Sequence, residues 1–339
     1  MKTRLFLIPL IPIAILFFLL YRIFEEPDDI SNVPHSLVVE FKRFTEPSHS
    51  TKKLGYQEKD YHHLLDIDFR FKTLSLVCGK HQPFLLILVH SAVGNFEKRR
   101  AIRETWGRGS NEAKVVFLLG SSVDSEMIER IRQESNSFSD LVIGSFLDTY
   151  RNLTYKHVMG LKYALYHCSS AVYVLKTDDD VFVNTPFFVE HIKSTISPYG
   201  AEKLLMCNVW HGASVARSHR SRYRFSFKEF PYKRFPTYCS GWVVLYSPDV
   251  VFDLYTQAQQ SQYFWVDDVF ITGILAEKSN IPHFNLRNIV ISKGKMDEIA
   301  DGRCDATNGK ILLGRPNIES DLVRKLWACA VLSDRQINS

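Results

Sequence analysis

Apolar runs of strand length alternate with helical patterns through most of this chain, and the alternation restricts the fold more than any other feature. Four runs are continuously apolar, as in strands buried on both faces, and they occupy residues 84–90, 115–120, 141–146 and 171–175. Between them, residues 124–133 and 155–168 carry apolar side chains at helical spacing. Strands that alternate with helices predict an α/β sheet with parallel segments, whose ligands bind at the carboxyl ends of the strands.

Three consecutive acids, Asp178, Asp179 and Asp180, follow the last of these runs. Carboxylates packed together repel one another unless a cation neutralises them. A hard divalent ion that prefers oxygen ligands, Mn²⁺ or Mg²⁺, is the natural partner, and such ions commonly bring a phosphate group with them. A solvated acidic turn is the alternative, but apolar stretches flank the triplet closely on both sides. The pattern therefore favours a metal site.

A second acidic site, Asp267 and Asp268, lies about ninety residues further on, also between apolar residues. Two separate acidic sites in one α/β domain suggest a division of labour. One would hold a metal ion and a diphosphate, and the other would remove a proton from an acceptor hydroxyl. For Asp267, a helix N-cap is an equally good interpretation.

The N-terminus carries the apolar run LFLIPLIPIAILFFLL at residues 5–20, with Lys2 and Arg4 before it and Arg22 after it. No small-x-small cleavage site follows, so an uncleaved anchor is favoured over the alternative, a cleaved signal peptide. Basic residues on its N-terminal side predict a cytosolic tail and a lumenal remainder. We therefore expect a single-pass type II membrane protein.

This topology divides the chain into a cytosolic tail (1–4), a transmembrane anchor (5–24), a stem (25–80) and a catalytic domain (81–339). The stem is rich in proline and polar residues, although residues 61–76 could pack against the domain. The six cysteines contain no C-x-x-C pair, which excludes a zinc ribbon, and an even number in a lumenal domain predicts structural disulfides. Fifteen pairings remain open.

The net charge of +5 is small and the basic residues are scattered along the chain, so the charge gives no argument for a nucleic-acid partner. One basic run interrupts this pattern, formed by Arg217, Arg220, Arg222 and Arg224. We interpret it as a solvated loop. The sequon at Asn152 lies at the start of a predicted helix, where a structural asparagine is favoured over a glycan.

Five segments, in order, resemble motifs of the β-1,3-galactosyltransferase and β-1,3-N-acetylglucosaminyltransferase family, to which Fringe is more distantly related. They are KRRAIRETW at 98–106, DTYRNLTYK at 148–156, KTDDDVFVN at 176–184, FPTYCSG at 235–241 and DDV at 267–269. Together they span roughly residues 84–290. The resemblance implies a GT-A fold, a Rossmann-type and mostly parallel sheet, in a Golgi membrane protein.

The resemblance also implies an activity. The family transfers galactose or N-acetylglucosamine from a UDP-sugar to the 3-hydroxyl of a glycan, using Mn²⁺ and inverting the anomeric carbon. The acceptor would be a glycoprotein or a glycolipid glycan, and a homo- or hetero-oligomer with other transferases is compatible with the pattern.

Its motifs place functional residues on this chain position by position. Asp180 matches the metal ligand, and Asp268 matches the general base. Asp178 and Asp179 fall near the ribose, the donor sugar or the metal, and Asp267 falls at an acceptor-positioning residue. The remaining expected donor-binding residues are Arg99, Arg103 and Lys156.

The sequence departs from the family pattern in three places. Asp267 replaces a glutamate, Trp242-Val243-Val244 replaces a glycine-rich stretch, and no late histidine is present to complete a metal shell. Water or His283 would then complete it, or metal dependence would be weaker. These departures keep open a catalytically weakened relative that binds glycans or other transferases. A metal-dependent phosphohydrolase fits the anchor and the ordered motifs poorly.

Overall fold

The computed structural model describes residues 41–46, 61–79, 82–221, 223–286, 289–304 and 311–337. Contacts group Phe41–Ser339 into one compact unit. The helices in the described ranges are all too short or too polar to cross a membrane. The predicted anchor at residues 5–24 lies outside the described residues.

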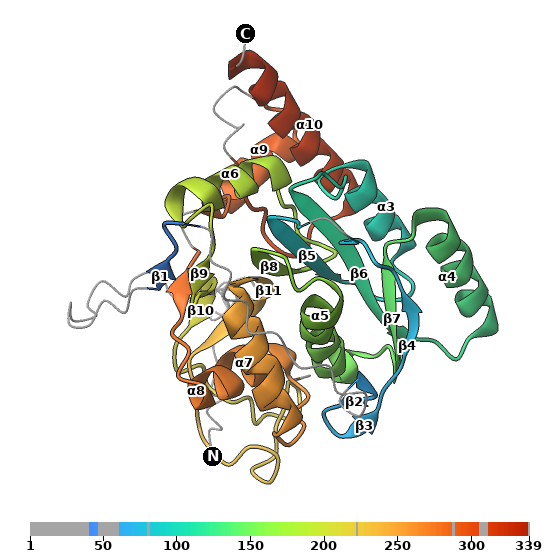
Figure 1. The fold of residues 1–339 in the computed structure, drawn as a ribbon, viewed down its shortest axis with the longest axis vertical. Helices are drawn as coiled ribbons and strands as arrows, with labels where there is room; N and C mark the ends of the chain where they lie inside the picture. Colours follow the sequence, from blue (N-terminus) through green and yellow to red (C-terminus); the bar gives the residue numbers. More distant parts are fainter. Residues whose placement is uncertain are drawn as a thin grey trace, which may run out of the picture. The chain divides into compact units, whose positions relative to one another are not determined.

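An eight-stranded mixed sheet forms the centre of the unit, in the order β12-β10-β11-β8-β5-β6-β7-β4 (Figure 1). Its strands are β4 (Phe71–Leu74), β5 (Leu85–His90), β6 (Ala113–Ser121), β7 (Leu141–Leu147), β8 (Tyr173–Asp178), β10 (Leu205–Trp210), β11 (Tyr238–Tyr246) and β12 (Phe284–Asn285). The neighbours β8, β5, β6 and β7 run parallel, whereas β4 and β11 are antiparallel to the strands beside them. The predicted α/β class is confirmed, and β5 to β8 are the four predicted runs.

Helices cover both faces of this sheet. They are α3 (Phe96–Glu104), α4 (Ser125–Phe138), α5 (Leu153–His167), α6 (Thr185–Thr195), α7 (Pro248–Gln259), α8 (Ala276–Lys278), α9 (Lys293–Ala300) and α10 (Ser320–Ile337), with a 3₁₀ turn η1 (Tyr150–Asn152) and a π-helix η2 (Val269–Leu275). One core contains apolar residues of α3, α4, α6, α9 and α10, and a second contains those of α5, α7 and η2. In Figure 1, α5 and α7 lie side by side over one face.

Strand β5 shows why the predicted runs are apolar throughout. Leu85, Ile87 and Val89 belong to the first core, while Leu86 and Leu88 belong to the second. Successive side chains point to opposite faces of a strand, so a strand covered on both sides needs apolar residues at every position. The sheet positions the site, because its central strand β8 ends at Asp178.

Part of the predicted stem packs with the domain, as the sequence left open for residues 61–76. Strand β4 pairs with β7 in the main sheet, and Cys78 forms a disulfide with Cys168 at the end of α5. Two small ribbons also involve this N-terminal part. Strand β1 (Lys42–Arg43) pairs with β9 (Ala201–Glu202), and β2 (His63–Leu64) pairs with β3 (Ile67–Asp68).

All six cysteines pair, which confirms the predicted structural disulfides and selects one of the open pairings. The other two bonds join Cys207 to Cys239 and Cys304 to Cys329. The first of these links the neighbouring strands β10 and β11, and the second ties α10 to the segment after α9.

Candidate functional site

The aspartate triplet stands at the carboxyl end of β8, where the parallel strands meet the antiparallel β11. Asp179 is 6% exposed, and its Oδ2 accepts hydrogen bonds from Ser91 Oγ at 2.6 Å and Asn95 Nδ2 at 2.8 Å. Both donors follow β5. Asp179 therefore fastens the segment after β5 to the end of β8.

Asp178 lies beside a buried lysine. Lys176 Nζ donates to Asp178 Oδ1 at 2.7 Å and to the carbonyl oxygen of Gly241 in β11. Desolvation raises the pKa of Asp178 to about 6 against the pull of Lys176, and the charges of Asp267 and Asp180 add to the rise. Lys176 thus lies between the triplet and the second acidic pair.

Asp180 is the member of the triplet whose carboxylate is least engaged by other side chains. It makes no hydrogen bond to another described side chain, and its one ion-pair partner in the described part of the chain is Lys98. Lys98 Nζ lies 3.6 Å from Asp180 Oδ2 and 3.6 Å from Asp179 Oδ1. This ammonium group places one positive charge between the two carboxylates, so the site can accept a cation there.

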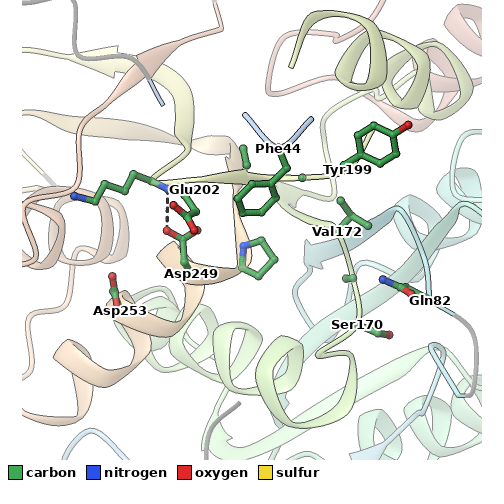
Figure 2. Close-up of a pocket in the computed structure, with 13 residues that line it drawn as sticks. Phe44, Gln82, Ser170, Val172, Tyr199, Glu202, Asp249 and Asp253 are labelled. Carbon is green, nitrogen blue, oxygen red and sulfur yellow. Dashed lines mark hydrogen bonds between the residues drawn. The ribbon is translucent and has the colours of Figure 1, made fainter. Parts of the chain in front are cut away.

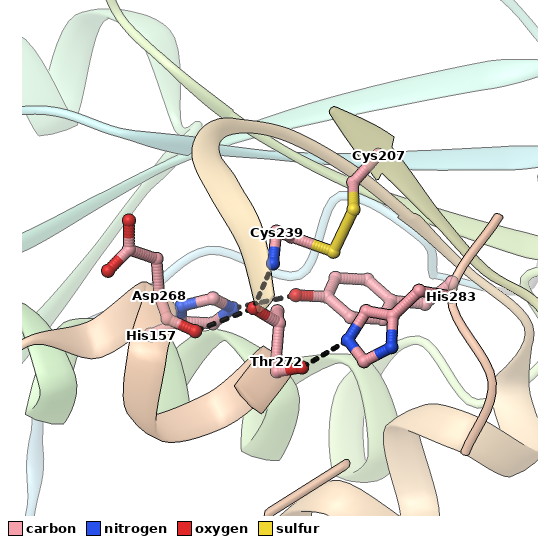
Figure 3. Close-up of a disulfide and its surroundings, with 7 residues drawn as sticks. His157, Cys207, Cys239, Asp268, Thr272 and His283 are labelled. Atoms are coloured by element: carbon pink, nitrogen blue, oxygen red, sulfur yellow. Dashed lines mark hydrogen bonds between the residues drawn. A yellow bond between two sulfur atoms is a disulfide. The ribbon is translucent and has the colours of Figure 1, made fainter. Parts of the chain in front are cut away.

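A divalent ion fits this arrangement only with oxygen ligands from outside the chain. Among the described residues, no group of three His, Cys, Asp or Glu side chains could hold a metal by itself. Carboxylate oxygens are suitable ligands for Mn²⁺ or Mg²⁺, and diphosphate and water oxygens could supply the rest of the shell. His283 is directed elsewhere: its Nε2 donates to the carbonyl oxygen of Thr272 in η2 (Figure 3). The interpretation of His283 as a metal ligand is therefore not supported.

The two arginines expected to bind a donor lie inside the protein. Arg99 is 0% exposed and bonds Glu134 through two nitrogens, at 2.9 and 2.7 Å. It also donates to Ser91 Oγ and to the carbonyl oxygen of Ala92, so it braces the segment that holds Asp179. Arg103 bonds Glu134 and Asp140. These contacts give both arginines a structural role, and direct donor binding stays a prediction.

Lys156 is also buried. Its Nζ donates to both carboxylate oxygens of Asp148, at 2.8 and 3.0 Å, and to the carbonyl oxygen of Ser91 at 2.6 Å. Burial lowers its pKa, although Asp148 opposes this. Lys156 supports the same segment after β5 as Arg99, and its contact with a donor likewise stays a prediction.

The second acidic pair lies at the start of the π-helix η2. Asp268 Oδ1 accepts from the backbone N–H of Val269 at 2.7 Å, so the capping bond considered for Asp267 is made by its neighbour. Burial and the charge of Asp267 raise the pKa of Asp268 to about 7. A carboxylate with this pKa is well matched to take a proton near neutral pH. π-helical turns occur frequently at functional sites.

A histidine, which is itself bonded to a tyrosine, holds Asp267 in place. His157 Nδ1 lies 3.0 Å from Asp267 Oδ2, and His157 Nε2 lies 3.0 Å from the hydroxyl of Tyr246. Burial lowers the pKa of His157, so the neutral ring donates to Asp267 and accepts from Tyr246. Burial alone would raise the pKa of Asp267, but the His157 hydrogen bond and Lys176 hold it below its ordinary value.

Backbone contacts fix where Asp268 stands. Thr272 Oγ1 donates to the carbonyl oxygen of Asp268 at 2.6 Å and accepts from the N–H of Cys239 at 2.9 Å (Figure 3). Cys239 belongs to β11 and is joined to Cys207. In the same strand, a Cβ added at Gly241 would lie 3.2 Å from Asp268 Cβ, so a glycine lets β11 approach the pair. The sequence analysis gave no role to Lys98, Lys176, His157, Tyr246 or Thr272, although Lys98 and Lys176 are the first residues of two of the motifs that it used.

A separate cavity of about 280 Å³ lies at the other end of β8, where residues Ser170 to Val172 precede the strand (Figure 2). Its carboxylates include Glu202, Asp249 and Asp253. Asp249 is already bonded to the N–H of Lys203 and to Ser247 Oγ. The aspartate triplet and the two lysines paired with it lie instead at the carboxyl end of β8.

Comparison with known proteins gives this site a family. A family model described as galactosyltransferase matches residues 97–287, more than half of the chain and all of the acidic site. The chain is 33% identical over 212 residues to beta-1,3-galactosyltransferase 1 of Homo sapiens and of Mus musculus, covering 61% of this chain and 64% of theirs. The alignment thus spans a little less than two thirds of those relatives.

A further relative is matched over a greater length. Beta-1,3-galactosyltransferase 5 of Gorilla gorilla gorilla is 31% identical over 231 residues, which cover 67% of this chain and 76% of that protein. The resemblance seen in the five sequence motifs is confirmed: the chain belongs to the galactosyltransferase family of glycosyltransferases.

Proposed function

We propose that this protein is a UDP-sugar-dependent β-1,3-hexosyltransferase of the Golgi membrane, with a GT-A-type catalytic domain in the lumen. The observation that carries the proposal is the convergence of two acidic groups, with different charge partners, on either side of Lys176. The triplet is lined by ammonium groups, and Asp268 has a pKa of about 7. An inverting transfer needs both a cationic place for a diphosphate and a base for a hydroxyl.

In this proposal, Asp178 and Asp180 face the donor diphosphate, and Asp180 is the residue that would hold Mn²⁺. The ion, when bound, would neutralise negative charge on the departing UDP. Lys98 lies close enough to both Asp179 and Asp180 to move between them and a phosphate oxygen. Arg99 and Lys156 keep the segment after β5 in place around the nucleotide.

On the acceptor side, Asp268 removes the proton from the 3-hydroxyl of the glycan. The acceptor oxygen forms a bond to C1 of the donor sugar, the bond from C1 to the phosphate oxygen breaks, and UDP leaves with the electron pair. Attack from the opposite face inverts C1, so an α-linked donor gives a β-1,3 product. No covalent enzyme intermediate is needed. Asp267, held by His157, keeps a negative charge beside Asp268 and sustains its basicity.

Galactose is the donor sugar that the names of the matched relatives favour, with N-acetylglucosamine as the alternative. The test is a donor screen with the full chain in detergent micelles. It offers UDP-galactose and UDP-N-acetylglucosamine with Mn²⁺ to simple β-linked acceptors, and linkage analysis identifies the product. Transfer that requires one UDP-sugar and yields a β-1,3 product supports the proposal. UDP binding without any transfer would favour the glycan-binding relative, and release of free phosphate would favour a phosphohydrolase.

The topology belongs to the same proposal. A cytosolic tail, an anchor at residues 5–24 and a stem would place the compact unit in the lumen, where disulfides form. Protease treatment of sealed microsomes should spare everything beyond about residue 22. Recovery of a secreted form that begins near residue 25 would favour a cleaved signal peptide instead.

A further inference from the structure

The segment that joins β10 to β11, residues 211–237, has a small core of its own, and we call it the β10–β11 loop. Val215, Phe225 and Phe230 are buried there with Trp265, and the rings of Phe225 and Trp265 stack with centroids 4.9 Å apart. Arg217 donates to the carbonyl oxygens of Phe225, Phe230 and Tyr232. These contacts hold the described part of the loop in one shape.

The outer surface of the β10–β11 loop combines positive charge with aromatic rings. Its exposed cations are Arg220, Arg224, Lys228, Lys233 and Arg234. None of them forms an ion pair with a described residue, and the one acid of the loop, Glu229, is bonded to Ser226. Three aromatic side chains stand among them: Tyr223 is 40% exposed, Phe227 66% and Tyr232 68%. Arg217, which the basic run in the sequence grouped with these residues, is instead part of the loop's framework.

The loop packs against the segment that leads to Asp268. Trp265, on which Phe225 stacks, precedes Asp268 by three residues along the chain. The Tyr223 ring lies 6.2 Å from that of Tyr150, which in turn lies 6.3 Å from Trp265. The loop returns to the sheet at Tyr238, the start of β11, whose Gly241 lies against Asp268. The core of the loop therefore packs against the segment that carries the proposed base.

We propose that the β10–β11 loop binds an acidic acceptor glycan, one that carries uronic acid carboxylates or sulfate esters beyond the sugar that is extended. The inference rests on the proposed transferase function and gives its acceptor a chemical class. Guanidinium and ammonium groups attract these anions, and aromatic rings pack on the apolar faces of pyranose rings. Position beside Trp265 and Asp268 favours a glycan over an anionic membrane surface as the partner.

The test compares two oligosaccharides that differ only in charge. Binding of an unsulfated chondroitin hexasaccharide and of its carboxyl-reduced counterpart is measured calorimetrically with the full chain in neutral detergent micelles, at low and moderate salt. The charged oligosaccharide should bind at least about tenfold more tightly, and added salt should reduce the difference because exposed charges are screened.

Two double variants locate the effect. Arg220→Gln with Arg224→Gln should weaken binding of the charged oligosaccharide about fivefold, given the modest strength of exposed ion pairs. Arg70→Gln with Lys72→Gln removes the same charge from exposed positions on and beside β4 and should change nothing. Equal binding of the two oligosaccharides, or equal losses in both double variants, would overturn the proposal. So would a loop variant that loses only binding to phosphatidylserine vesicles, because that result assigns the loop to a membrane surface.

A transfer assay separates this inference from the proposed function. Transfer to a small neutral β-galactoside should be unchanged in the Arg220→Gln/Arg224→Gln variant, because its reacting hydroxyl needs only the site around Asp268. Absence of transfer from any UDP-sugar, with charge-dependent glycan binding intact, would overturn the transferase function alone. Normal transfer without charge-dependent binding would overturn the loop proposal alone.

Discussion

The aspartates after β8 and the aspartates before η2 are the same residue type with different charge partners. Ammonium groups of Lys98 and Lys176 lie within 3.6 Å of the triplet, at the carboxyl end of β8. Asp268 instead lies beside the negative charge of Asp267, and desolvation together with that charge raises its pKa to about 7. The first arrangement places ammonium groups against carboxylates, where a cation could bind, and the second prepares one carboxylate to accept a proton. Lys176 acts on both.

The largest expected effect tests the base side of this comparison. Asp268→Asn keeps the shape of the side chain and removes its basicity, so kcat should fall by at least about 100-fold, within the usual range for general-base catalysis. UDP binding should stay at the wild-type level, since the proposal places no diphosphate contact on this residue. Initial rates and calorimetry of UDP binding measure the two quantities. Asp68→Asn, an exposed change on β3, is the control, and a kcat equal to that control would remove Asp268 from the mechanism.

The triplet side is tested by Asp180→Asn. Loss of this charge should weaken Mn²⁺-dependent UDP binding by about tenfold to 100-fold, the range seen when groups that tune a metal site are removed. Thermal unfolding should be unchanged, because the carboxylate of Asp180 makes no hydrogen bond with another described side chain. Calorimetry of UDP with and without Mn²⁺ checks this. Unaltered UDP affinity with unaltered metal dependence would mean that the triplet is only a solvated turn.

The position of Asp268 is tested by a matched pair at Thr272. Thr272→Val removes the hydroxyl between Cys239 and Asp268, so kcat should fall about tenfold because the base is displaced. The buried N–H of Cys239 would also lose its acceptor, which should lower the free energy of unfolding by about 1–3 kcal/mol. Thr272→Ser keeps both hydrogen bonds and should restore kcat. A loss of stability without any loss of kcat in Thr272→Val would show that Thr272 supports the fold and not the base.

The smallest effect is expected at Asp267, and it appears in the pH profile. Wild-type kcat/KM should rise with pH through about 7, because Asp268 must be ionised to act as a base. Asp267→Asn removes the neighbouring negative charge, so the pKa of Asp268 falls and the rise should move to lower pH by less than about one unit. The drop in kcat should be a few-fold. A profile that stays in place would mean that Asp267 does not tune Asp268, and a loss equal to that of Asp268→Asn would leave the base unassigned within the pair.

Much of the fold could be read from the sequence. The four predicted strands became β5 to β8, because a strand covered on both faces must be apolar throughout and this pattern is local. The predicted helices at 124–133 and 155–168 became α4 and α5 with slightly different ends. The role of residues 61–79 was less clear, since β4 is short and joins the sheet only through pairing with β7, which lies far along the chain.

The residues of the candidate site were also only partly predictable from the sequence. The sequence located the acids Asp178 to Asp180 and Asp267 to Asp268, because their motifs are contiguous. It could not tell which arginines and lysines face a ligand. Arg99 and Lys156 carry charges that suit a diphosphate, yet the fold buries both of them against Glu134 and Asp148. Whether a charge is exposed depends on packing, and a motif does not record it.

The sequence by itself determined the α/β class, the family and the two acidic sites, because periodicity and contiguous motifs are properties of neighbouring residues. Only the tertiary structure decided how those acids differ. It brought His157 of α5 to Asp267, 110 positions away, and placed Lys98 of α3 beside a triplet that follows β8. Charge partners, burial and pKa depend on groups that meet across the folded core. They are therefore set by packing rather than by order along the chain.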